Sequence, residues 1–167
     1  MTSLKNRKAI ITGGGRGLGK ATALAFAKEG IDVAITGRNE RVLQQTVTEL
    51  EALGVKAMYA VFDVGNYEEV KKSIKSIIDT MGSVDILVNN AGSFVPGSVY
   101  NEPEGNLETM IEVNLYSAYH LTRRLLPVMM AAKSGHIFNI CSVAALQAYP
   151  AGGSYSISKF ALQGFSK

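Results

Sequence analysis

The sequence contains a single cysteine, Cys141, and no tryptophan among its 167 residues. One cysteine cannot form a disulfide within the chain, which excludes the small secreted proteins held together by disulfides, so we expect a reducing, cytoplasmic location. No stretch approaches the about 18 consecutive apolar residues that a membrane-spanning helix needs, so we expect no membrane partner. Residues 1–15 also lack the apolar core of a signal peptide.

Charged and metal-binding residues are few and scattered. The chain carries 17 lysine and arginine residues against 14 aspartate and glutamate residues, and no basic run is longer than Lys71–Lys72 and Arg123–Arg124. A dedicated nucleic-acid binder usually gathers its basic residues on one surface, so we expect no nucleic-acid partner. The two histidines, His120 and His136, and the one cysteine do not have the spacing of zinc ligands, so we expect no metal site.

Short apolar runs alternate with longer amphipathic segments along the whole chain. The apolar runs predict strands at residues 9–12, 32–36, 56–62, 84–92 and 136–142. The amphipathic segments predict helices at residues 17–29, 39–53, 67–80 and about 106–132, and a last helix that begins near Ser154. This alternation is typical of a parallel sheet covered on both faces. We therefore expect an α/β fold over residues 1–167, a single domain with a doubly wound parallel sheet of the Rossmann type.

The chain ends at Lys167, inside the last predicted helix. The closing segment, ALQGFSK, carries no capping signal. An exposed edge of a central strand would be a liability for the sheet. We therefore expect further sequence beyond Lys167, which makes this domain truncated within its last helix.

A glycine-rich loop, TGGGRGLGK at residues 12–20, connects the first predicted strand to the first predicted helix. Glycine allows the backbone to turn tightly and to approach a phosphate, and a helix N-terminus offers unpaired N–H groups. A magnesium-dependent P-loop would need Ser or Thr at position 21, where this chain has Ala21. A dinucleotide-binding loop fits better, with a purely structural turn as the alternative.

The end of the second predicted strand indicates which dinucleotide is bound. An acidic residue at this place binds the ribose hydroxyls of NAD, whereas an arginine accommodates the 2′-phosphate of NADP. Here the strand ends Thr36-Gly37-Arg38, without an acid, and a guanidinium suits a phosphate. Arg16 in the glycine-rich loop is a second candidate cation. Either arginine could instead be a solvated surface residue, but the pattern favours NADP(H).

Four polar residues in the second half of the chain have the chemistry to move a proton. Tyr155 and Lys159 share one face of a helix, and a nearby ammonium favours the ionised form of a phenol. Reduction of a carbonyl needs such a group, because a proton must reach the developing alkoxide. Ser142 ends the fifth predicted strand, where ligands bind in α/β sheets, and its hydroxyl could hold a substrate oxygen. Asn114 could orient a helix carbonyl or a water.

Together these motifs resemble those of the short-chain dehydrogenase/reductase family, in their order and at their usual spacings. The shared motifs are the loop TGGGRGLG, Asp63-Val64, Asn89-Asn90-Ala91-Gly92, Asn114, Ser142 and YSISK. The resemblance covers essentially the whole chain. It implies an NADP-dependent oxidoreductase that acts on a small-molecule carbonyl substrate.

The resemblance also implies a role for each matching residue. Tyr155 would be the general acid/base, and Lys159 would promote its ionisation and bind the nicotinamide ribose. Ser142 would orient the carbonyl, and Asn114 would support a water-linked proton relay. The implied cofactor-binding residues are Gly13, Arg16, Gly17, Leu18, Gly19, Arg38, Asp63, Val64, Asn90, Ala91 and Gly92, together with Tyr155 and Lys159.

The expected function is reduction of a carbonyl by NADPH. The resemblance favours a 3-oxoacyl-carrier-protein reductase, with a sepiapterin-reductase-like enzyme or a general ketone reductase as alternatives. A hypothesis of another class is a non-catalytic NADP(H)-binding scaffold or sensor. The helices that begin near residues 106 and 154 resemble those that pack between subunits in family tetramers, so we expect a homo-oligomer, either a dimer or a tetramer.

Overall fold

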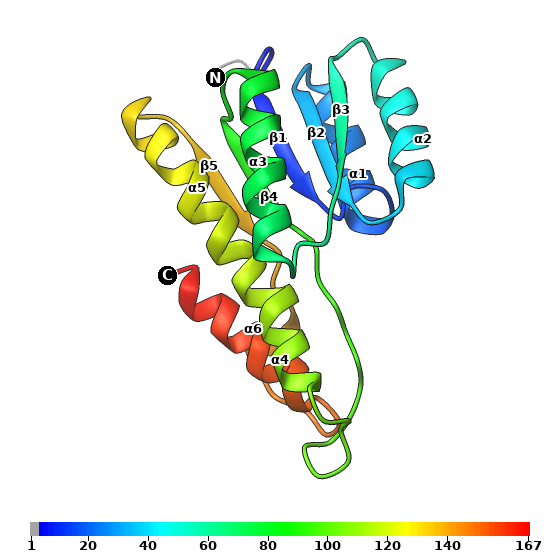
Figure 1. The fold of residues 1–167 in the computed structure, drawn as a ribbon, viewed down its shortest axis with the longest axis vertical. Coiled ribbons are helices and arrows are strands. Elements are labelled where there is room, and N and C mark those ends of the chain that lie inside the picture. Colours follow the sequence, from blue (N-terminus) through cyan, green and yellow to red (C-terminus); the bar gives the residue numbers. More distant parts are fainter. Residues whose placement is uncertain (1–3) are drawn as a thin grey trace.

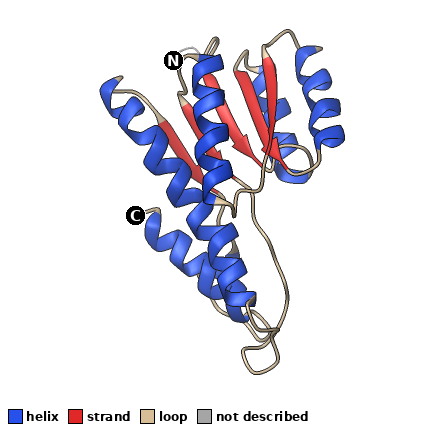
Figure 2. Ribbon diagram, in the orientation of Figure 1, coloured by secondary structure: helices blue, strands red, loops and turns tan. Residues whose placement is uncertain are grey.

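The computed structural model describes residues 4–167, in which five parallel strands form one sheet with helices on both faces (Figures 1 and 2). The strands are β1 (Lys8–Thr12), β2 (Asp32–Gly37), β3 (Ala57–Val61), β4 (Ile86–Asn89) and β5 (His136–Asn139). The helices are α1 (Gly17–Lys28), α2 (Glu40–Glu51), α3 (Tyr67–Met81), α4 (Asn106–Ile111), α5 (Ser117–Ala131) and α6 (Gly153–Phe165). A π-helical turn lies at Glu112–Tyr116 and a 3₁₀ turn at Val143–Ala145.

The strand order is β3-β2-β1-β4-β5, and every pairing is parallel. The chain builds the sheet outward from β1 to β3 and then crosses back to place β4 on the other side of β1. Loops that leave β1 and β4 at this reversal run in opposite directions, which opens a crevice at the carboxyl ends of the strands. The order confirms the predicted doubly wound Rossmann-type fold.

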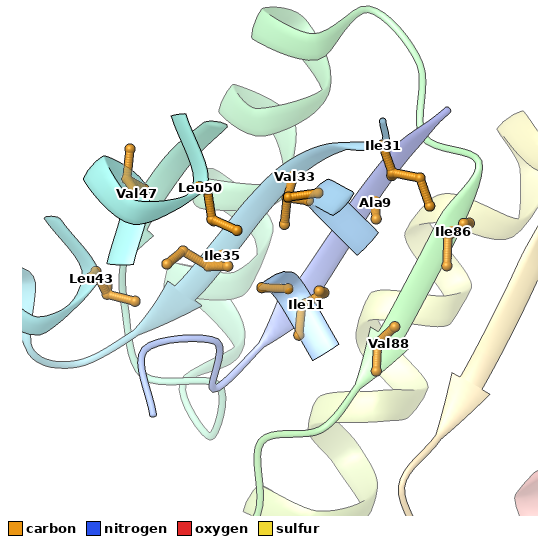
Figure 3. Close-up of a cluster of buried hydrophobic side chains, with 12 residues drawn as sticks. Ala9, Ile11, Ile31, Val33, Ile35, Leu43, Val47, Leu50, Ile86 and Val88 are labelled. Atoms are coloured by element: carbon orange, nitrogen blue, oxygen red, sulfur yellow. The ribbon is translucent and has the colours of Figure 1, made fainter. Parts of the chain in front are cut away.

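Both faces of the sheet are apolar, because side chains of successive strand residues alternate between the two faces. On one face, Ile11 and Val33 pack against α1 and α2 in a buried cluster that includes Leu43 and Leu50 (Figure 3). On the other face, Ile10 and its neighbours pack against α3 and α5. These two layers hold the carboxyl ends of β1 and β4 in a fixed position relative to each other.

Three strands are shorter than the sequence predicts: β3 by one residue at each end, and β4 and β5 by three residues at their carboxyl ends. The apolar pattern extends to residues 92 and 142, but β4 ends at Asn89 and β5 at Asn139. The ladder stops after Asn89 because the next N–H, that of Asn90, donates to the Thr12 hydroxyl at 3.0 Å. Beyond β5, Ser142 lies at the start of the 3₁₀ turn, so it follows the strand by three residues.

The long helix predicted at 106–132 is three segments, α4, the π-helical turn and α5. In the π-helical turn, the N–H of Ser117 donates to the carbonyl of Glu112, five residues back. The extra residue in such a turn shifts the faces of the helices on either side, and π-turns are often found at functional sites. Here the turn contains Asn114, which is 2% exposed.

α4 and α6 pack against each other beyond the carboxyl edge of the sheet (Figure 1). A long loop, residues 90–105, leaves β4 and runs along this pair of helices before α4 begins (Figure 1). Within residues 4–167, no helix has both the length and the apolar character needed to cross a membrane.

Candidate active site

The glycine-rich loop after β1 turns tightly against the sheet and against α1. Gly13 has a φ of +65°, in the left-handed region that favours glycine. A Cβ atom at Gly19 would collide with the carbonyl of Gly13 and with the Asn90 side chain. Gly19 is therefore needed because α1 packs closely on the loop, while Gly17 and Leu18 lie exposed on the outer side of the turn.

Thr12 and Asn90 connect the glycine-rich loop to the end of β4. The Thr12 hydroxyl accepts hydrogen bonds from the N–H groups of Asn90 at 3.0 Å and Ala91 at 2.9 Å. In return, the Asn90 amide donates to the Thr12 carbonyl at 2.8 Å. Thr12 is not among the site residues predicted from the sequence, although its position as the last residue of β1 was a usable signal.

A cavity of about 1170 Å³ lies at the carboxyl ends of β1 to β4. Eight of the predicted cofactor residues line it: Gly13, Arg16, Arg38, Asp63, Val64, Asn90, Ala91 and Gly92. The other five predicted cofactor residues, Gly17, Leu18, Gly19, Tyr155 and Lys159, are not part of the lining. Further lining residues that the sequence analysis missed include Asn39, Val42, Asn66, Tyr67 and Val113, because only the fold brings them to this edge.

Arg16, Arg38 and the N-terminus of α1 are the parts of the cavity that could hold an anionic ligand, although the acids Asp63, Glu69 and Glu112 also line it. Arg16 is the N-cap residue of α1 but makes no capping hydrogen bond from its side chain, and the first turn of α1 contains no acid. The first N–H groups of this helix therefore remain without a side-chain acceptor, which favours a bound phosphate. The Arg38 guanidinium lies 3.7 Å from the Asp63 carboxylate, with the two side chains 81% and 44% exposed. These residues fit a dinucleotide whose pyrophosphate meets α1.

Asn114 joins three segments next to Ser93, a residue that lines this cavity. Its side-chain oxygen accepts from the N–H of Ser93 at 2.8 Å, and its side-chain nitrogen donates to the carbonyl of Ser93 at 3.0 Å. The same nitrogen donates to the Ser158 hydroxyl at 2.9 Å, which itself donates to the carbonyl of Tyr155 at 2.8 Å. Asn114 was predicted from the sequence but Ser93 and Ser158 were not, because both serines are distant from it along the chain.

Lys159 is buried on α6, and its ammonium donates to the carbonyl of Ile140 at 3.0 Å. Burial lowers the pKa of Lys159, and the nearby Cys141 offsets this only in part. The ammonium lies 5.9 Å from the centre of the Tyr155 ring. The predicted sharing of one helix face by Tyr155 and Lys159 is therefore present in the structure.

Ser142 occupies the N-cap position of the 3₁₀ turn that follows β5. Its hydroxyl oxygen accepts a hydrogen bond from the N–H of Ala144 at 3.2 Å. The 3₁₀ turn packs against α6, so Ser142 and Tyr155 lie on neighbouring segments. A hydroxyl that accepts from the backbone keeps its own proton available for donation to a ligand oxygen.

Cys141 is free and partly buried. Among residues 4–167, no group of three or more histidine, cysteine, aspartate or glutamate side chains could hold a metal ion.

A doubly wound parallel sheet with a glycine-rich turn and a cavity at its reversal point defines the Rossmann class, whose members bind dinucleotides at this place. The sequence profile described as short chain dehydrogenase matches residues 7–167. The chain therefore belongs to the short-chain dehydrogenase/reductase family of oxidoreductases, which confirms the resemblance inferred from the motifs.

Individual relatives and structures agree with this assignment. The ketoacyl reductase HetN of Nostoc sp. (strain PCC 7120) is 37% identical over 97% of this chain and 56% of its own length. Human 17-beta-hydroxysteroid dehydrogenase 13 is 35% identical over 95% of this chain and 53% of its own length. A short chain dehydrogenase/reductase from Burkholderia phymatum, in complex with NAD, has a TM-score of 0.94 and 30% identity, covering 99% of this chain and 59% of that one. The chain spans about half the length of the curated relatives it matches.

Proposed function

We propose that this chain is the cofactor-binding and proton-handling part of an NADPH-dependent carbonyl reductase. The observation that carries the proposal is the linked group of Asn114, Ser158, Tyr155 and Lys159, two of which, Asn114 and Lys159, lie next to Gly92 in the lining of the cavity. The Lys159 ammonium bonds to a carbonyl oxygen, so no carboxylate neutralises it in the described contacts. Its charge therefore acts on the nearby phenol and on a ligand.

Each residue of the site has a separate role in the proposed reduction of the carbonyl. NADPH, when bound, supplies the hydride that reaches the carbonyl carbon. The Tyr155 hydroxyl gives its proton to the carbonyl oxygen, so the product is an alcohol and the tyrosine becomes a phenolate. The Lys159 ammonium stabilises this phenolate, and the Ser142 hydroxyl donates to the same substrate oxygen. Asn114 holds the backbone around Ser93 and, through Ser158, the backbone of Tyr155.

The preference for NADPH over NADH rests on the end of β2. No acid is present there to meet the ribose hydroxyls, and Arg38 lines the cavity instead. Its contact with Asp63 joins two exposed side chains, and such pairs are weak, so the guanidinium is free to turn to a phosphate. A similar structure from Burkholderia phymatum is in complex with NAD, so titration of this chain with both NADPH and NADH tests the proposed preference.

The proposed substrate is a ketone with an apolar substituent, in first place a 3-oxoacyl thioester. The relatives named ketoacyl reductase and hydroxysteroid dehydrogenase support this class. Exposed apolar side chains near the proton-handling residues support it as well, with Phe94 against Tyr155 and Val143 directly after Ser142. Other ketones, including those of the sepiapterin type, are the alternatives.

Replacement of the proposed acid tests the mechanism. Tyr155→Phe removes the transferable proton and leaves the ring in place, so we expect NADPH oxidation with a ketone to slow by about a hundredfold or more. NADPH affinity, measured by fluorescence titration, should stay close to that of the original chain. Tyr100→Phe is the matched control, because Tyr100 is 88% exposed on the loop after β4.

Two outcomes would count against the mechanism. Unchanged turnover in Tyr155→Phe would exclude this tyrosine as the acid. NADPH binding without oxidation by the original chain, across a broad panel of ketones, would instead favour a non-catalytic cofactor-binding protein.

A further inference from the structure

The loop after β4 docks on the first turn of α6 (Figure 1). The N–H of Gly97 donates to the carbonyl of Ala151 at 3.1 Å. In the same loop, the Phe94 ring meets the Tyr155 ring edge to face, with ring centres 4.7 Å apart. Such aromatic pairs are favourable and directional, so the loop already constrains the ring of the proposed acid.

Glu102 is the residue of this loop with the most hydrogen bonds to α6. One carboxylate oxygen accepts from the N–H of Ser154 at 2.8 Å. The other accepts from the Ser154 hydroxyl and, at 3.2 Å, from the side-chain amide of Asn106, the first residue of α4. A single carboxylate therefore holds the starts of both α4 and α6, and Ser154 directly precedes Tyr155.

α6 cannot cap its own N-terminus. The N-cap residue is Gly152, which has no side chain, and the first turn contains no acid. The first N–H groups of a helix need acceptors, which the N-cap side chain normally provides to the second or third residue. Here Ser154 is the second residue of α6, and its acceptor is Glu102, from a distant part of the sequence.

The backbone leaves room for this carboxylate. A Cβ atom at Gly153 would collide with the Glu102 carboxylate, so the close approach requires a glycine at that position. The hydrogen bonds from Ser154, the hydroxyl first and then the N–H, lower the pKa of Glu102, and partial burial opposes this. The carboxylate form is thus the one that these donors stabilise, and it also complements the helix dipole.

We infer that Glu102 is a positioning residue that fixes the first turn of α6, and thereby the Tyr155 side chain, through its bonds to Ser154. This inference rests on the proposed function, in which Tyr155 is the residue that transfers the proton. The reaction itself does not involve Glu102, which reaches the site only through Ser154. The same loop supplies Phe94, which contacts the Tyr155 ring. The loop therefore holds both the ring of Tyr155 and the helix turn that carries it.

The position of the Tyr155 ring can be measured without turnover. NMR spectra of the chain with labelled tyrosine, assigned by comparison with Tyr155→Phe, report the shift that the Phe94 ring current causes on the Tyr155 ring protons. Glu102→Ala should move this resonance toward that of an exposed tyrosine, and amide exchange at Ser154 should become faster. Glu104→Gln is the matched control, an exposed glutamate of the same loop, and should change neither.

Kinetics distinguish positioning from a purely structural cap. A misplaced acid should lower kcat by about tenfold to a hundredfold, since small displacements of a reacting group have effects of this size. The KM for NADPH should change by no more than about twofold, because a group that acts only in the transition state leaves binding of the cofactor unaffected. Glu102→Gln should give a smaller loss, since its amide oxygen can still accept from Ser154 while its NH₂ group meets the Asn106 donor.

Three results would overturn the inference. One is an unchanged Tyr155 resonance in Glu102→Ala, or in Glu102→Gln if the alanine variant does not fold. Another is a shifted resonance with an unchanged kcat. The third is an equal change in Glu104→Gln. Absence of turnover in the original chain would contradict the proposed function alone, because the NMR measurement needs no catalysis.

Discussion

Arg38→Ala is the sharpest test of the proposed cofactor, because it removes one charge at the cavity mouth and little else. The Arg38 side chain is 81% exposed, and its one described ion pair, to Asp63, is long at 3.7 Å. Asp63 keeps its other contact, since its carboxylate accepts from the N–H of Gly65 at 2.9 Å. We therefore expect the variant to fold as the original chain does and to differ mainly in its affinity for a phosphate.

The expected loss of NADPH affinity in Arg38→Ala follows from the exposure of the guanidinium. A hydrogen bond to a charged group contributes about 1.5–3 kcal/mol, and solvent screening at this exposed position favours the lower end, about 1.5 kcal/mol. This corresponds to about tenfold weaker binding of NADPH. NADH has no 2′-phosphate, so its affinity should change by no more than about twofold, as for an ordinary surface substitution.

Fluorescence titrations of both cofactors, at low and at raised salt, measure these affinities. The advantage of the original chain for NADPH should shrink at raised salt, because ions screen exposed charges. Arg41→Ala is the matched control, since Arg41 is exposed on α2 and does not line the cavity. Equal losses for NADPH and NADH, or a loss in Arg41→Ala as large as that in Arg38→Ala, would refute the assignment of the 2′-phosphate to Arg38.

Two further predictions concern stability. Gly19→Ala should lower the free energy of unfolding by about 1–3 kcal/mol in denaturant titrations, because the added Cβ overpacks the contact with Gly13. Gly164→Ala, where a Cβ meets nothing within 4 Å, should instead raise it by up to about 1 kcal/mol, and the same sign in both variants would disprove the packing argument. The pKa of Lys159 is lowered from 10.5 in the folded chain, so between that lowered value and 10.5 the unfolded chain binds a proton that the folded chain lacks. Stability of the original chain relative to Lys159→Met should therefore rise with pH across this window, and a flat difference would contradict the burial of the ammonium.

Much of the fold was predictable because its signals are local. The apolar runs and amphipathic segments predicted all five strands and the sites of the helices between them, and the glycine-rich loop predicted the turn after β1. Tyr155 and Lys159 share a helix face because they are four residues apart, a spacing that any α-helix converts into proximity. The boundaries of β4 and β5 were wrong: β4 ends where the N–H of Asn90 donates to Thr12, and just beyond β5 the carbonyl of Ile140 accepts from the Lys159 ammonium.

The partners of the candidate site residues came only from the tertiary structure. The sequence by itself determined the class of fold and the family, because local patterns and the order of the motifs carry that information, and it supplied Tyr155 and Lys159 for the proposed proton-handling group. It did not predict that Asn114 bonds to Ser93 and Ser158, that a π-turn contains Asn114, or that Glu102 caps α6. Those contacts join segments distant in the sequence, and their geometry exists only once the helices have packed against the carboxyl edge of the sheet.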